Sequence, residues 1–124
     1  MAAADFELRT VEWTTARIAV VGLALVSAAI HFALAATTGS EVFALLALGL
    51  LAGFVIFFTE LWSPVLYLLG AIFVGIMTVV WILAGTPVFW LGAFDKVVQS
   101  ALFVLFAYLF VVEQRVGEEA PPPE

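Results

Sequence analysis

His31 is the only histidine in the chain, and it lies well inside a long apolar run. A lone polar group near hydrocarbon usually has a polar partner. Asp95 and Gln99 are four residues apart near the start of a later apolar run, so they share a helix face. If the two runs are antiparallel, His31 and Gln99 lie at similar depth, and Ser27 lies one turn from His31 on the same face. The sequence therefore predicts a cluster of His31, Asp95 and Gln99.

This cluster has two interpretations. In the structural one, which is preferred, Asp95 favours a helix N-terminus, Lys96 extends to the lipid headgroups, and His31 and Gln99 share one interhelical hydrogen bond. In the functional alternative, a carboxylate that orients a histidine forms a proton relay or a hydrogen-bonding site for a quinone-like carbonyl, because histidine titrates near neutrality. Both interpretations require His31 to meet a polar side chain of the later run.

Metal and cofactor sites are not expected. One histidine and one carboxylate fall short of the usual three or four protein ligands, and there is no cysteine to supply a thiolate. Haem between two helices would need a second axial ligand, which only a homodimer sharing His31 could supply.

Enzyme signatures are also missing. There is no Gly-rich phosphate loop, no GxSxG, no HExxH and no pair of carboxylates within one apolar run. The middles of the second and third runs offer little that could line an ion path, which speaks against a channel or pump formed by a monomer. The sequence favours a protein that is not an enzyme.

The composition indicates a membrane protein. Hydrophobic residues make up 65% of the chain, charged residues 11%, and the mean hydropathy is +1.22, far from the soluble average of about half apolar and a quarter charged. A net charge of -6 with only four Lys and Arg excludes nucleic acid as a partner. The lipid bilayer is the expected partner.

Four apolar runs of spanning length stand between turn signals, and in lipid such runs are satisfied only as helices. The predicted spans are 17–36, 41–61, 64–84 and 94–112. Short loops make neighbours antiparallel. The predicted fold is thus an all-α membrane protein, an antiparallel up-down-up-down bundle of four transmembrane helices. It forms one domain over residues 1–124, with acidic tails at 1–12 and 113–124.

The charges at the helix ends predict an orientation. Asp5, Glu7 and Glu12 occupy what would be the basic region of a signal peptide, so the first run is expected to remain as a helix. Three arginines lie on the side of the termini, and Lys96 lies alone on the other. The excess of positive charge places both termini in the cytoplasm and the chain in the cell membrane.

Small residues spaced four apart predict close helix packing. Gly49 and Gly53 form a GxxxG pair, and Ala71 with Gly75 forms a similar one. Packing within the bundle is the simpler interpretation. The alternatives are a homo-oligomer or docking into a larger membrane complex.

The segments Ala-Ile-His-Phe at 29–32 and Phe-Asp-Lys-Val-Val-Gln at 94–99 carry a resemblance. The chain resembles, from about Thr15 to Gln114, a haloarchaeal family of small four-span membrane proteins of unknown function. The resemblance implies the four-span fold and a halophilic archaeal source, which the acidic tails also favour. It implies no activity.

Together these features predict an accessory or interaction subunit of a membrane assembly, without enzymatic activity. The alternative is a small-molecule or proton-handling site at His31, Asp95 and Gln99.

Overall fold

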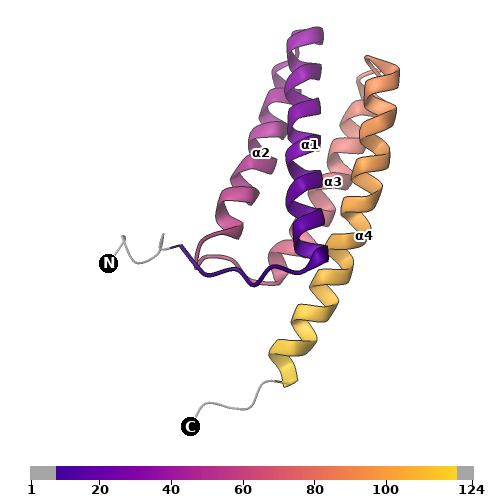
Figure 1. Cartoon of the computed structure of the whole chain (residues 1–124). Helices are drawn as coiled ribbons and strands as arrows, with labels where there is room; N and C mark the ends of the chain where they lie inside the picture. The colour runs from indigo at the N-terminus through magenta and orange to yellow at the C-terminus, as the bar shows by residue number, and fades with distance from the viewer. Residues whose placement is uncertain (1–7, 120–124) are drawn as a thin grey trace.

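A computed structural model describes residues 8–119, with side chains up to residue 115. It has four helices and, among the described residues, no strand beyond an isolated bridge between Leu8 and Thr59. The helices are α1 (Thr15–Thr38), α2 (Glu41–Phe57), α3 (Val65–Leu83) and α4 (Phe89–Glu119). Each runs against the previous one, so that α1 begins and α4 ends at the same end of the bundle (Figure 1). The predicted all-α bundle is confirmed.

The helices are apolar enough for a membrane, but they differ in length. The segments Thr15–Thr38, Val65–Leu83 and Phe89–Arg115 are long and apolar enough to cross one, whereas α2 has 17 residues. The outer surface carries large apolar side chains, among them Leu45, Leu69 and Val104, which are more than half exposed. Such a surface suits hydrocarbon and not water. The helices are therefore compatible with a small multi-pass integral membrane protein.

Three helix boundaries differ by four residues or more from the predicted spans. The second helix ends at Phe57 instead of residue 61, because the Thr59 hydroxyl donates a 2.8 Å hydrogen bond to the Ile56 carbonyl and accepts one of 3.2 Å from the Leu61 amide. These side-chain bonds replace the next helical turn. The fourth helix begins at Phe89 instead of residue 94, and the Gly92 amide already bonds the Val88 carbonyl at 3.0 Å. It ends at Glu119 instead of residue 112, so the first seven residues of the expected tail are helical.

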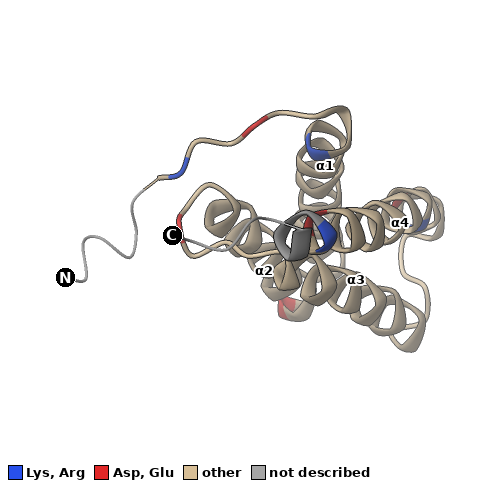
Figure 2. Cartoon of the chain, turned by 90° about the horizontal axis from the view of Figure 1, so that it is seen from below, with Lys and Arg blue, Asp and Glu red and all other residues tan. Residues whose placement is uncertain are grey.

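The helices pack in the order α2, α1, α4, α3. Helix α1 contacts both α2 and α4, and α3 packs on α4. An end-on view shows α3 on the far side of the bundle from α1 (Figure 2). Helices α2 and α3 follow one another in the sequence, yet they are the first and last helices of this packing order.

An extended segment, Leu8–Trp13, crosses the end of the bundle before α1, and we call it the strap (Figure 1). The Arg9 amide donates a 2.9 Å hydrogen bond to the Phe58 carbonyl, and the Trp13 ring lies 5.7 Å from that of Phe58. The strap is therefore held against the turn between α2 and α3.

At the same end, an ion pair and a hydrogen bond to its carboxylate connect three helices. Nη2 of Arg17 on α1 lies 3.0 Å from Oε2 of Glu113 on α4, and the Tyr67 hydroxyl of α3 donates a 2.8 Å hydrogen bond to that oxygen. Glu60 and Arg115, which could also pair at this end, form no ion pair in the described part of the chain.

Candidate functional site

His31 of α1 and Asp95 of α4 meet inside the bundle, and both side chains are fully buried. Nδ1 of His31 lies 3.5 Å from Oδ2 of Asp95. The same ring nitrogen lies 2.9 Å from the Ser27 carbonyl oxygen, one turn earlier on α1. Since a carbonyl only accepts hydrogen bonds, this contact favours the tautomer with its proton on Nδ1. The ring is thereby fixed, with Nε2 on its far side.

Ser27 connects the remaining polar groups to this pair. Its hydroxyl donates a 2.8 Å hydrogen bond to Oδ1 of Asp95 and accepts one of 3.4 Å from Nε2 of Gln99. Gln99 therefore reaches His31 through Ser27. The direct hydrogen bond between His31 and Gln99 expected in the structural interpretation does not occur among the described residues.

Lys96 turns into the network, which corrects the expectation that it extends to the headgroups. Its Nζ lies 2.5 Å from Oε1 of Gln99, 3.7 Å from Oδ2 of Asp95 and 5.4 Å from the centre of the Trp81 ring. Thr78 of α3 donates a 2.9 Å hydrogen bond to the same Gln99 oxygen. We call the six residues the polar network: Ser27, His31, Thr78, Asp95, Lys96 and Gln99.

Lys96 and Thr78 are the members that the sequence analysis missed. The sequence contained features that could have indicated both residues. Lys96 is adjacent to Asp95 and three residues before Gln99, and Thr78 is one of the few polar residues of its run. Helix α4 begins at Phe89, so Asp95 and Lys96 lie past its first turn. Asp95 is thus held by Ser27, His31 and Lys96 and not by the start of a helix.

Two atoms of the network have no hydrogen-bond partner although they are buried. They are Nε2 of His31 and Oδ2 of Asp95. Oδ2 of Asp95 lies between two cationic or potentially cationic groups, the His31 ring and the Lys96 ammonium. In a medium of low dielectric constant, such an arrangement can hold a proton and pass it between imidazole and carboxylate.

The network reaches the outer surface at a shallow groove between α3 and α4. The groove has a volume of about 330 Å³, and Thr78 and Gln99 contribute to it beside apolar residues such as Val74 and Phe103. A molecule in the surrounding lipid could contact the network at this position.

The predicted packing residues have different surroundings. A Cβ placed on Gly49 would lie 2.6 Å from Cζ of Phe73, so the α3 ring occupies the space that a side chain would need. Ala71 is buried. Gly53 and Gly75 have no atom near a Cβ placed on them. Gly49 and Ala71 thus lie at contacts within the bundle, whereas Gly53 and Gly75 face open space.

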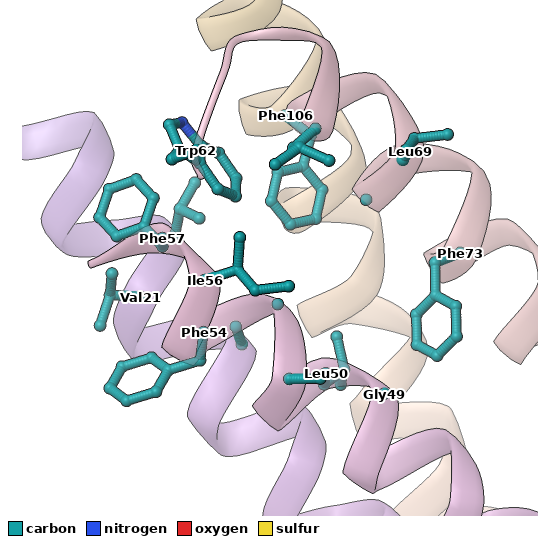
Figure 3. A pocket seen from close by; sticks show the side chains of 16 residues that line it. Val21, Gly49, Leu50, Phe54, Ile56, Phe57, Trp62, Leu69, Phe73 and Phe106 are labelled. Atoms are coloured by element: carbon teal, nitrogen blue, oxygen red, sulfur yellow. The ribbon is translucent and has the colours of Figure 1, made fainter. Parts of the chain in front are cut away.

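A second cavity, which we call the crevice, lies between α2 and α3 (Figure 3). Its volume is about 300 Å³, and its lining includes Gly53, Ile56, Leu69 and Phe106. The Trp62 ring lies at the end nearest the turn between α2 and α3 (Figure 3). The crevice belongs to the half of the bundle that holds the strap, whereas the polar network belongs to the other half.

The described residues contain no group of three or more histidine, cysteine, aspartate or glutamate side chains that could hold a metal ion. Fold and site together describe a small helical protein with apolar helices and a buried ionisable network. No protein family, characterised protein or solved structure matches this chain. The resemblance to haloarchaeal four-span proteins remains a prediction.

Proposed function

We propose that this protein binds a proton or a small hydrogen-bonding ligand of the membrane at His31, Asp95 and Gln99. The observation that carries the proposal is the fully buried contact of 3.5 Å between His31 and Asp95, in two apolar helices. Ionisable side chains are costly at such positions and generally serve a function there. A purely structural cluster would be expected to satisfy every polar atom, whereas His31 Nε2 and Asp95 Oδ2 lack hydrogen-bond partners.

The geometry supports a role for each residue. The Ser27 carbonyl orients the His31 ring, leaving Nε2 to accept a proton, and the Asp95 carboxylate stabilises the imidazolium that results. A carbonyl ligand, such as a quinone, would enter at the groove between α3 and α4, which Thr78 and Gln99 line, and accept a hydrogen bond from one of these two side chains. This is binding chemistry and requires no bond to be broken in the ligand.

The single histidine makes a direct test available. With nitrogen-15 in histidine only, NMR of the protein in lipid nanodiscs reports the protonation of His31 alone. We expect its ring resonances to change as the pH is lowered, or on addition of a short-chain quinone. We also expect Asp95→Asn to alter that response.

Thr37→Ala is the control, because the Thr37 hydroxyl is exposed, bonds only its own helix at the Ala33 carbonyl and does not line the groove. It should leave the His31 response unchanged. Resonances that respond neither to pH nor to the quinone would show that the network is structural and would refute the proposed function.

The second candidate is an accessory or interaction subunit of a larger membrane assembly, or a homo-oligomer. It is favoured by exposed glycines on three helices, Gly22, Gly53 and Gly75, each with open space where a Cβ would stand. Such positions let a second helix approach closely. Purification from native membranes in mild detergent, after cross-linking, should then retain a stoichiometric partner. Recovery of the chain alone and monomeric would count against this role.

We also propose a cell-membrane location with both termini in the cytoplasm, and a halophilic archaeal source. The orientation is supported by Arg9, Arg17 and Arg115 at one end of the bundle against Lys96 at the other. The source is supported by the acidic tails and by the resemblance described above.

A further inference from the structure

Arg9 lies at the strap end of the crevice with its charge only partly satisfied. Its Nε donates a 2.6 Å hydrogen bond to the Phe57 carbonyl, while its Nη2 is buried without a hydrogen-bond partner. No carboxylate of the described residues forms an ion pair with it. Burial lowers the pKa of Arg9 from its ordinary value, yet a guanidinium remains charged in proteins. A half-buried cation of this kind favours an anionic partner.

The same aromatic rings contact both the guanidinium and the crevice. The Arg9 carbon Cζ lies 4.6 Å from the centre of the Phe57 ring and 5.9 Å from that of Trp62. Both rings also line the crevice. The Trp62 indole Nε1 is a second buried donor without a partner. A cation and an indole N–H at the end of a membrane helix bundle are the groups that recognise lipid headgroups at the interface.

The crevice has the lining and the size for a segment of one hydrocarbon chain. Its volume of about 300 Å³ is at the lower end of the ~300–1,000 Å³ typical of ligand pockets. Leu66, Leu69 and Ile56 give it an apolar lining between α2 and α3. In a membrane protein an apolar space of this kind suits a lipid chain, and Arg9, which has no ion pair among the described residues, favours an anionic headgroup.

We propose that the strap end of the bundle is a binding site for one anionic lipid, with its phosphate at Arg9 and Trp62 and one hydrocarbon chain in the crevice. The phosphate oxygens accept hydrogen bonds from Nη2 of Arg9 and Nε1 of Trp62. The strap is held to the turn through Arg9, so a small movement of the strap admits the headgroup. This site is separate from the polar network and does not depend on its function.

Native mass spectrometry of the full chain tests the proposal, using micelles with equal amounts of phosphatidylglycerol and phosphatidylcholine. We expect one retained phosphatidylglycerol, preferred on the order of tenfold, which is the difference that one or two charge-assisted hydrogen bonds provide. Arg9→Gln should abolish the preference. Its control is Arg115→Gln, which removes the same charge from an exposed residue near the end of α4 and should keep the preference.

A second variant tests the chain-binding part. Gly53→Leu fills the crevice, where a Cβ meets no atom within 4 Å, and should expel the retained lipid whatever its headgroup. Its control is Gly22→Leu, the same change at an exposed glycine that does not line the crevice. Circular dichroism establishes that each variant is folded.

Three results would overturn the proposal. Wild type could retain both lipids equally, or Arg115→Gln could lose the preference as Arg9→Gln does. Finally, inorganic phosphate could displace the lipid in wild type while Gly53→Leu leaves retention unchanged, which would indicate a site for free phosphate. None of these results bears on the nitrogen-15 response of His31, so the two proposals succeed or fail separately.

Discussion

The hydroxyl of Ser27 on α1 donates a 2.8 Å hydrogen bond to Oδ1 of Asp95 on α4. Both side chains are fully buried, and the same hydroxyl accepts a hydrogen bond from Gln99. Ser27 therefore couples the carboxylate to the amide, and its main-chain carbonyl also holds the His31 ring. One small residue thus touches three of the polar groups that α1 and α4 share.

Ser27→Ala should destabilise the protein. The substitution removes one donor to Asp95 and one acceptor for Gln99 in a place that water does not reach, and an unsatisfied buried group costs about 1–3 kcal/mol. The free energy of unfolding in detergent micelles measures the effect. Ser100→Ala, at an exposed hydroxyl, should change it by less than ~0.5 kcal/mol. Equal effects of the two variants would show that the Ser27 bond contributes nothing.

Tyr67→Phe should weaken the strap end of the bundle. The Tyr67 side chain is fully buried, and its hydroxyl bonds the carboxylate that also pairs with Arg17. A hydrogen bond to a charged group contributes about 1.5–3 kcal/mol. Unfolding in micelles should show a loss of that order, whereas Tyr108→Phe, at a side chain 55% exposed, should be neutral. A neutral Tyr67→Phe would contradict the three-helix connection.

Gly92→Ala should disturb the other end of the bundle. A Cβ at Gly92 would clash with the ring of Trp81, which is 5% exposed and donates a 3.0 Å hydrogen bond to the Pro87 carbonyl. Moving a packed ring typically costs about 1–3 kcal/mol. The control is Gly75→Ala, where a Cβ meets open space. A lower melting temperature for Gly92→Ala alone is the expected result, and unchanged melting of both variants would refute the close approach.

Much of the fold could be predicted because the solvent restricts it. Long apolar runs predict helices, because hydrocarbon requires each segment to satisfy its own backbone polar groups, and the four runs separated by turn signals are four helices in the structure. The end of α2 could not be predicted from hydropathy, since Thr59 ends it through hydrogen bonds to its neighbours. The packing order α2, α1, α4, α3 could not be predicted from the sequence either, because helices that are neighbours in the sequence, such as α2 and α3, are expected to contact each other.

The contact between His31 and Asp95 could be predicted because few polar residues inside the helices are available as partners. The prediction that Lys96 extends to the headgroups was wrong because the start of its helix was misplaced. An expected start at Phe94 placed Lys96 at the surface, whereas the observed start at Phe89 places it more than a turn deeper, where it faces Gln99. Thr78 was missed because the predicted cluster combined only the first and fourth helices, whereas Thr78 reaches Gln99 from α3.

The orientation in the membrane can be measured with single cysteines, because the natural chain has none. Ser40→Cys lies between α1 and α2 at a residue whose side chain makes no capping bond, and Gln114→Cys is exposed near the end of α4. With both termini in the cytoplasm, a membrane-impermeant maleimide should label the first variant in intact cells and the second only after lysis. The reverse pattern would invert the orientation.

The unequal lengths of α1 and α2 have a consequence for the surrounding bilayer. At ~1.5 Å per residue, the 24 residues of α1 extend about 36 Å and the 17 residues of α2 about 25 Å. A hydrocarbon layer of ~30 Å is too thick for the second helix but not for the first. Hydrophobic mismatch of this kind thins the bilayer locally, at a cost of fractions of a kcal/mol per Å. The protein should therefore perturb its lipids asymmetrically, most strongly beside α2, and accumulate where the membrane is thinner.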